Sequence, residues 1–303
     1  MNKIVQILFL VAISIYLLYG IDISKLDISI FSKMGLFLTI LSIFLSQIIL
    51  SIRWSVMSKI NFKKSLETII VSSALNILLP ARLGELSKAF YLKKFYNYKY
   101  HKTLSIIFIE RFFDIVMLFL IMCFCAYEYI SNNSIKSGIL ILSIFILITT
   151  LFFNSQKISI LLKKIPFKFL RVYTQKIYKN IKKLLKTPYP TLFWTTCLWM
   201  TYLLSNTVFF MYGVNFHLSF QETLELFIFF TIALSIPITP AGLGTFEGTI
   251  VLFLTSHGVN KVNVLMSATL YHILIFAIDF IMLYIFLLVK DIKFKELIKN
   301  EKS

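Results

Sequence analysis

The chain has 303 residues, of which 58% are hydrophobic and 15% are charged. Soluble domains carry about 25% charged residues, so this composition excludes an ordinary soluble protein and predicts an integral membrane protein. The net charge of +17 would suit a protein that binds nucleic acid. The basic residues, however, lie between the apolar stretches and at their ends, which is the distribution expected of cytoplasmic loops that face anionic lipid. We therefore expect an anionic membrane surface as a partner, and no nucleic acid.

Six apolar stretches are long enough to cross about 30 Å of hydrocarbon as helices. They are Ile4 to Gly20, Met34 to Ile52, Leu104 to Tyr129, Gly138 to Phe153, Thr191 to Tyr212 and Leu265 to Val289. The first resembles a signal peptide, but no small-residue cleavage site follows it, so we expect an uncleaved span. The sequence predicts an all-α polytopic membrane protein, with residues 1–303 forming a single integral membrane domain.

Two further apolar elements are too short to cross. One is Ser65 to Leu79; the other is Leu226 to Ile238, followed after the glycines by Thr245 to Ser256. At 1.5 Å per residue each arm reaches only about 18 to 23 Å. We expect re-entrant or broken-helix elements at both places.

The basic residues predict the orientation. Residues 155–187 contain ten Lys or Arg and no Asp or Glu, which predicts a cytoplasmic loop. The basic segments Arg53 to Lys64 and Arg82 to Lys102 lie on the same side only if Ser65 to Leu79 enters and leaves from the cytoplasm. The basic tail from Lys290 lies inside only if Leu226 to Ser256 enters and leaves from the outside, so the two short elements enter from opposite faces. We expect a protein of the cytoplasmic membrane with both termini in the cytoplasm.

The same basic loop has an amphipathic pattern. It is either a solvated loop or a helix on the membrane surface with lysines toward the headgroups, and the two readings are compatible. The apolar side of that helix would consist of Ile160, Leu161, Ile165, Leu184 and Leu185.

The two short elements carry related motifs. Pro80 to Glu85 reads PARLGE, and Pro240 to Glu247 reads PAGLGTFE, with the same Pro-Ala-x-Leu-Gly core. Matching breaks of opposite orientation are typical of inverted repeats, whose interface holds a substrate site near the membrane midplane. We predict such a repeat from residues 65–102 and 224–256, although the first copy continues as a basic, aromatic segment typical of an interfacial helix.

The stretch from Ile236 to Gly248, IPITPAGLGTFEG, is the main candidate site. Its prolines and glycines cannot form a continuous helix. Broken backbone at membrane depth is tolerated only where it is buried in protein or lines a water-filled cavity. The candidate residues are Pro240, Gly242, Gly244 and Glu247. Alternatively, the glutamate only caps the helix that follows.

Charged residues also flank the first break. Arg82 lies beside Gly84, where a guanidinium can hold a phosphate together with helix N-terminal donors. Glu85 follows directly and is a second candidate. The alternative is an arginine that binds lipid headgroups without specificity.

A third charged group, ERFFD, enters the span that begins at Leu104. Glu110 and Asp114 lie on one helical face, and Arg111 can pair with Asp114. Three charges in an apolar run are costly unless they face the bundle interior, where they would complement a cation such as Arg82. The alternative is that carboxylates near a helix start stabilise its dipole.

Asp279 lies in the middle of the last span, where an unpaired carboxylate is costly. His272 lies on the same face and could share a proton or hydrogen bond with it. We favour a functional or pairing role; the alternative is a protonated carboxyl that holds helices together. Arg53 and Trp54, by contrast, are expected to be membrane anchors.

The sequence lacks a nucleotide-binding loop, a zinc motif and a Ser-His-Asp constellation. We therefore expect no metal, no cofactor and no catalytic residue. ATP-driven transport and metal-dependent hydrolysis have no support in the residues.

Four motifs together resemble the lysylphosphatidylglycerol synthase transmembrane region, also called the flippase-like or UPF0104 family. They are Arg53-Trp54, PARLGE at Pro80, ERFFD at Glu110 and PITPAGLGTFEG at Pro237. The resemblance covers nearly the whole chain and implies translocation of a phosphate-bearing lipid or lipid-linked glycan between leaflets. We do not expect the aminoacyl-transferase domain that follows this region in the bacterial multiple peptide resistance factor, so we assign no lysyl transfer. The residues that match the family pattern are Arg82, Glu85, Glu110, Arg111, Asp114, Pro240, Gly242, Gly244 and Glu247.

The sequence thus favours a lipid translocator over an enzyme. The anionic headgroup of a phospholipid or a polyprenyl-phosphate-linked lipid would lie between the two broken elements, with Arg82 on its phosphate. The residues that would gate the lipid path, or couple its movement to an energy source, are Glu110, Asp114, Glu247 and Asp279. The alternative is a membrane enzyme, or an accessory subunit of one, that modifies lipid-linked sugars or phospholipids. A homo-oligomer is compatible with either reading.

Overall fold

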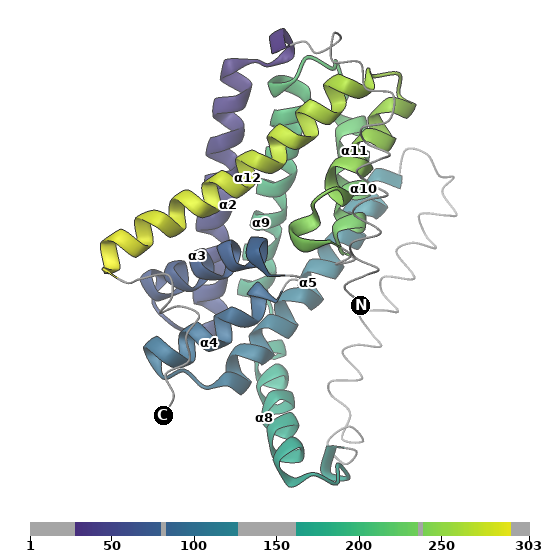
Figure 1. Cartoon of the computed structure of the whole chain (residues 1–303). Coiled ribbons are helices and arrows are strands. Elements are labelled where there is room, and N and C mark those ends of the chain that lie inside the picture. The colour runs from purple at the N-terminus through teal and green to yellow at the C-terminus, as the bar shows by residue number, and fades with distance from the viewer. Residues whose placement is uncertain (1–27, 80–82, 127–161, 236–238, 292–303) are drawn as a thin grey trace. The chain divides into compact units, whose positions relative to one another are not determined.

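The computed structural model of the chain describes residues 28–79, 83–126, 162–235 and 239–291 (Figure 1). Across these ranges the backbone is helical, apart from connecting turns and one isolated antiparallel bridge between Phe31 and Val214. The predicted all-α fold is confirmed for this part of the chain. The spans predicted at Ile4 to Gly20 and Gly138 to Phe153 lie outside the described residues, so the number of spans stays a prediction.

The described residues form nine α-helices. In chain order these are α2 (Lys33–Ser58), α3 (Phe62–Leu78), α4 (Gly84–Tyr96), α5 (Tyr100–Ala126), α8 (Lys168–Leu185), α9 (Tyr189–Thr207), α10 (Phe220–Ser235), α11 (Thr245–Ser256) and α12 (Lys261–Lys290). A π-helical segment at Val208–Gly213 continues α9, and 3-10 turns lie at Ile28–Ile30 and Pro240–Gly242.

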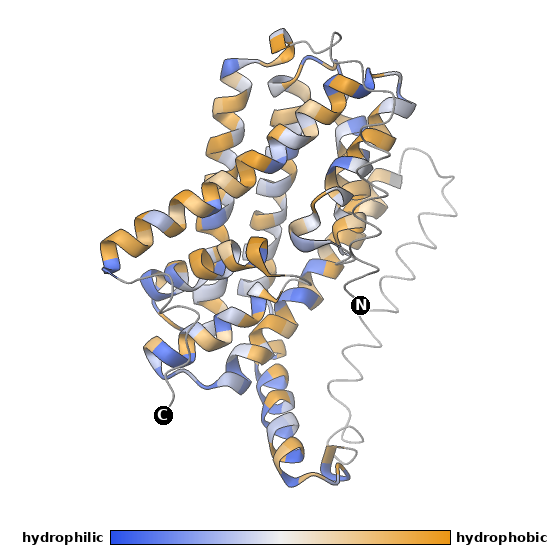
Figure 2. Cartoon of the chain, viewed as in Figure 1, coloured by the Kyte–Doolittle hydropathy of each residue, from blue (hydrophilic) through white to orange (hydrophobic). Residues whose placement is uncertain are grey.

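Two of the described helices are long and apolar enough to cross a membrane, α2 with 26 residues and α12 with 30. They match the spans predicted at Met34 to Ile52 and Leu265 to Val289. Figure 2 shows apolar residues along most of both helices and a denser mixture of polar residues on α4 and α8. Helix α5, and α9 with its π-helical extension, occupy the other two predicted spans that the structure describes.

The short elements form separate helices, as predicted. Helix α3 ends at Leu78, just before the PARLGE motif, and α4 begins at Gly84 within that motif. Helix α10 ends at Ser235, and α11 begins at Thr245. With 12 residues, α11 is about 18 Å long. The membrane face from which each element enters stays a prediction.

Contacts within the chain divide it into two units, each assembled from separated segments. Unit 1 contains residues 1–48, 69–87 and 200–303, and unit 2 contains residues 49–68 and 88–199. Helices α2, α3, α4 and α9 contribute residues to both. In unit 1, α11 packs against α10 and α12; in unit 2, α5 packs against α8. That residues 1–303 form a single membrane domain stays a prediction.

A buried aromatic cluster holds α11 and α12 together in unit 1. The Tyr271 ring stacks on Phe209 with centroids 4.7 Å apart and lies 5.6 Å from Phe210 and 6.0 Å from Phe246. Its hydroxyl donates a hydrogen bond to Ser205 at 3.0 Å. Tyr271 is buried among these contacts, and the next residue of α12, His272, is a candidate of the site.

Helix α8 lies in the basic loop, as expected, but part of its apolar side faces protein rather than lipid. It packs along α5, and Ile181 is buried. Leu184 and Leu185, expected against lipid, are half-buried. Ile160 and Leu161 lie outside the described residues.

Candidate functional site

In the described part of the break between α10 and α11, residues 239–244, three residues lie in the left-handed region of backbone space. Pro240–Gly242 forms a single 3-10 turn, and Leu243 and Gly244 lead into α11. Ala241, Gly242 and Gly244 have φ angles of +54°, +78° and +76°. Glycine adopts this region at little cost, whereas other residues are strained there. The predicted interruption of the helix is therefore confirmed.

Glu247 has two partners at this break. Its Oε2 accepts a hydrogen bond from the backbone nitrogen of Gly244 at 2.8 Å, so the capping role given as the alternative for Glu247 is present. Its Oε1 lies 2.7 Å from Nδ1 of His272 on α12, and the side chains are 9% and 7% exposed. The rings of Phe246 and Phe276 lie 4.6 and 4.2 Å from the imidazole, centroid to centroid. A carboxylate and an imidazole thus meet in an otherwise apolar environment.

Asp279 is buried, as predicted, but its partner is not His272. Its Oδ1 accepts a hydrogen bond from Nε2 of Gln47 on α2 at 2.8 Å. The other amide atom of Gln47 accepts from the hydroxyl of Ser73 on α3 at 3.4 Å. The expectation that His272 and Asp279 share a proton or hydrogen bond is wrong, since each contacts a different helix. In unit 1, α12 therefore contacts α11 through His272 and Glu247. It also contacts α2 through Asp279 and Gln47, and Gln47 in turn binds Ser73 on α3.

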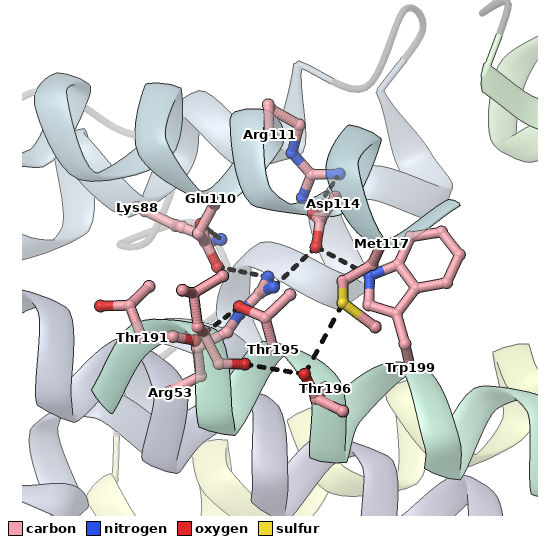
Figure 3. A network of polar contacts seen from close by, with 11 residues as sticks. Arg53, Lys88, Glu110, Arg111, Asp114, Met117, Thr191, Thr195, Thr196 and Trp199 are labelled. Atoms are coloured by element: carbon pink, nitrogen blue, oxygen red, sulfur yellow. Dashed lines mark hydrogen bonds and ion pairs between the residues drawn. The ribbon is translucent and has the colours of Figure 1, made fainter. Parts of the chain in front are cut away.

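A buried ion network in unit 2 joins α2, α4, α5 and α9 (Figure 3). Arg53 donates hydrogen bonds to Oε1 of Glu110 at 2.9 Å and to Oδ1 of Asp114 at 2.7 Å. Nζ of Lys88 lies 2.8 Å from the other oxygen of Glu110. Nε1 of Trp199 donates to Asp114 at 3.1 Å. The prediction that Glu110 and Asp114 share one face of α5 is confirmed, and the buried cations that bind them are Arg53 and Lys88.

Arg53 and Trp54 are not the interfacial anchors predicted from the sequence. They are 1% and 0% exposed, and Nζ of Lys88 lies 4.5 Å from the centre of the Trp54 ring. A cation over an indole face is attracted by the ring quadrupole, and more strongly when both are desolvated. Arg53 also lies more than one turn before the end of α2 at Ser58, inside the helix.

Arg111 differs from its two acidic neighbours on α5. Its Nη1 lies 3.2 Å from Oδ2 of Asp114, so the predicted pair is confirmed. Its side chain is 41% exposed, however, whereas that of Asp114 is 13% exposed and that of Glu110 is fully buried. The expectation that all three charges face the interior is therefore wrong for Arg111.

The first break is closely packed where α4 begins. A Cβ atom on Gly84 would lie 2.6 Å from Cα of Asn76 on α3, so no larger residue fits there without movement of the backbone. The hydroxyl of Ser72 donates to the Gly84 carbonyl at 2.9 Å. Glu85, half-buried, follows in the first turn of α4. Arg82 lies outside the described residues, so its phosphate-binding role stays a prediction.

Two cations and one amide of these sites were not among the sequence candidates: Arg53, Lys88 and Gln47. The segment around Lys88 is basic and aromatic, which predicts an interfacial helix rather than a buried ion pair. Gln47 stands alone in an apolar span, and a polar side chain at such a position is itself a signal of a helix–helix contact. Among the described residues, no three His, Cys, Asp or Glu side chains are grouped as metal ligands would be.

Residues 3–282 match the model of the family described as the lysylphosphatidylglycerol synthase TM region. The chain belongs to this family. The family resemblance of the four motifs is thereby confirmed. In this chain PARLGE lies at the first break, ERFFD lies in the ion network and PAGLGTFE lies at the second break.

One relative of the chain is a membrane protein of Methanocaldococcus jannaschii, named UPF0104 membrane protein MJ1078. It is 30% identical over 197 residues, which cover 59% of this chain and 78% of the relative. No solved structure matches the chain significantly. Family membership and the apolar helices together identify a helical membrane protein with a lipid-related role.

Proposed function

We propose that this chain moves a phosphate-bearing lipid or a lipid-linked glycan from one membrane leaflet to the other. The observation that carries the proposal is the interrupted helix between α10 and α11, whose capping carboxylate Glu247 lies 2.7 Å from His272 of α12. Membrane transporters place substrate sites at such interruptions, where half-helix ends and polar side chains meet the substrate near the midplane.

A headgroup that crosses the apolar layer needs polar partners at membrane depth. Unit 1 offers them at two levels of α12, through the Glu247–His272 pair and the Gln47–Asp279 hydrogen bond. Ionisable residues inside membrane segments are rare because they are costly, and they commonly mark the path of a substrate. Glu247 and Asp279 are accordingly the proposed gating groups of unit 1, and Glu110 and Asp114 those of unit 2.

The proposed phosphate ligand at the first break is Arg82. A guanidinium offers a planar pair of donors that matches two phosphate oxygens. Glu85, at the start of α4, is the proposed orienting or gating group beside it. The chain would act in the cytoplasmic membrane with both termini in the cytoplasm, on a phospholipid or a polyprenyl-phosphate-linked lipid.

Leaflet exchange in liposomes tests the proposal. The purified chain is reconstituted with a fluorescent phosphate-bearing lipid, and an impermeant reductant bleaches label only in the outer leaflet. We expect bleaching to continue beyond the outer-leaflet share, with unchanged lipid masses and with slower exchange for Arg82→Ala. Bleaching that stops at the outer-leaflet share contradicts translocation. A new lipid species without exchange would favour a membrane enzyme instead.

A further inference from the structure

The part of unit 1 from residue 200 to residue 290 has few side chains that can carry a positive charge. Its two lysines, Lys261 and Lys290, are the first and last residues of α12, and it contains no arginine. Its three histidines are His217, His257 and His272. The first two are exposed, whereas His272 is buried at the break before α11.

An anionic headgroup that reaches this break needs a positive partner there. Residues 220–256, which form the break and the helices on either side of it, contain no Lys or Arg and have three carboxylates: Glu222, Glu225 and Glu247. A charge without a partner costs much more free energy in an apolar environment than in water. Within residues 200–290, His272 is therefore the side chain that can meet a phosphate at this break with a positive charge.

His272 is bound to a carboxylate that opposes such a charge. Its Nδ1 lies 2.7 Å from Oε1 of Glu247, and the rings of Phe246 and Phe276 pack against the imidazole. Two titratable groups at this distance gain and lose protons as a pair, and each added proton makes the pair more positive by one charge. A nearby anion favours the state of the pair with one more proton, because opposite charges attract strongly in an apolar environment.

The other titratable side chains around the pair in unit 1 are Tyr271, Asp279, Tyr212, Glu222 and Glu225. The hydroxyl of Tyr271 donates to a serine of α9, and the carboxyl of Asp279 accepts from a glutamine of α2. Tyr212, in the π-helical extension of α9, is exposed. Glu222 and Glu225 lie in the first two turns of α10, at the end away from the break. An anion at the break therefore acts most directly on the Glu247–His272 pair.

We propose that the Glu247–His272 pair takes up one proton from water when an anionic lipid headgroup binds at the break before α11, so that lipid binding is linked to proton binding. The proton neutralises the charge that the phosphate brings into an apolar environment. Release of the lipid returns the proton to water. The proposal deepens the proposed function and rests on it, because translocation is what brings the headgroup to this break. It names the proton as the ion that accompanies the lipid.

The pH dependence of lipid binding tests this linkage. The full chain in an uncharged detergent is titrated by calorimetry with short-chain phosphatidylglycerol, between about pH 5 and pH 9, where its phosphate keeps its charge. We expect the dissociation constant to rise with pH, by up to about tenfold per pH unit, as one linked proton requires. The double variant Glu247→Gln/His272→Phe cannot take up this proton, and its dissociation constant should not depend on pH. A flat pH dependence for wild type, or an equal slope for the double variant, overturns the proposal.

A matched histidine and two other ligands serve as controls. His257→Phe removes an exposed histidine that also packs on a phenylalanine, Phe253, and should keep the slope of wild type; loss of the slope would overturn the assignment to the buried pair. An uncharged glycolipid with the same chains should bind wild type independently of pH, and an equal slope would show that pH acts without the anion. Excess sulfate should displace the phospholipid poorly, because it lacks acyl chains; displacement at equal concentration would overturn the assignment to a lipid.

A second measurement uses the wild-type chain alone, so it does not depend on the folding of a variant. Calorimetry in two buffers with different heats of ionisation counts the protons taken up with each lipid. We expect about one proton per lipid at the pH of the steepest slope, and none would overturn the linkage. Leaflet exchange with no proton uptake would leave translocation standing and overturn the linkage. Proton-linked binding in a chain without leaflet exchange would leave the linkage standing and contradict translocation.

Discussion

His272 and Glu247 meet at the break before α11, with Nδ1 of the imidazole 2.7 Å from Oε1 of the carboxylate. The second oxygen of Glu247 caps the same helix through the Gly244 nitrogen. One carboxylate thus fixes the start of α11 and binds α12. A change at His272 therefore acts on the break itself, although His272 lies on a different helix.

The contact predicts coupling between these two residues. His272→Phe keeps an aromatic ring beside Phe246 and Phe276 but leaves a buried carboxylate oxygen without its partner, which costs about 1 to 3 kcal/mol. Glu247→Gln keeps the cap, because glutamine also completes a capping box. In a double-mutant cycle measured by detergent unfolding, we expect a coupling energy of about 0.5 to 3 kcal/mol. Strictly additive effects would contradict the contact.

The ion network predicts that two arginines bound to the same carboxylate differ in their contribution to stability. Arg53→Gln removes a buried partner of both Glu110 and Asp114, and we expect a loss of about 3 to 5 kcal/mol in the free energy of unfolding. Arg111→Gln removes an exposed partner of Asp114 and should cost at most about 1 kcal/mol. Thermal unfolding in detergent compares them, and equal losses would show that the network is not buried.

Alanine substitution at two glycines, Gly84 and Gly248, is expected to change the stability of the chain in opposite directions. Gly84→Ala places a Cβ against the backbone of Asn76, which cannot move without displacing α3, and should destabilise the chain by more than 1 kcal/mol. Gly248→Ala lies inside α11, where a Cβ meets nothing within 4 Å, and should stabilise the chain by about 0.5 to 1 kcal/mol. The melting temperatures of the two variants test this. A tolerated Gly84→Ala would show that α3 and α4 do not approach as described.

The hydroxyl of Tyr96, at the end of α4, is expected to titrate at high pH. Burial and then its hydrogen bond to Glu67 raise the pKa of Tyr96 to about 12 from a usual 10.0. Because the folded pKa is raised, this contact stabilises the fold fully below pH 10 and is lost as pH rises through about 12. The tyrosinate absorbance of wild type minus that of Tyr96→Phe reports the pKa. Glu67→Gln should lower it, and an unchanged pKa would contradict the assignment to Glu67.

The two breaks could be located from the sequence because their causes are local. Proline lacks a backbone donor and glycine readily adopts left-handed backbone, so the local sequence is sufficient to predict the interruption at Gly242 and Gly244. The cap formed by Glu247 is equally local, three residues from Gly244. The apolar runs likewise predicted α2 and α12 because length and composition suffice.

The partners of the charged residues could not be predicted, because they lie far apart in the chain. Glu247 and His272 are 25 positions apart, and Arg53 and Glu110 are 57 apart. The local sequence around an arginine near the end of an apolar run is the same whether the arginine contacts lipid headgroups or two buried carboxylates. Only the packing of α2 against α5 within unit 2 distinguishes the two cases. For this reason the sequence predicts a membrane anchor at Arg53, where the structure has a buried ion pair.

The central claim is tested most directly by the leaflet-exchange rate of Glu247→Gln beside that of Glu222→Gln. Both substitutions remove one charge from a carboxylate that binds a backbone nitrogen near a helix start. Glu222 is half-buried and makes a solvent-exposed hydrogen bond to Ser219, whereas Glu247 is buried against His272. We predict that Glu247→Gln, incorporated into liposomes as efficiently as wild type, exchanges lipid at least about tenfold more slowly, a barrier increase of about 1.4 kcal/mol. Glu222→Gln should match wild type. Unaltered exchange by a folded Glu247→Gln would contradict the account.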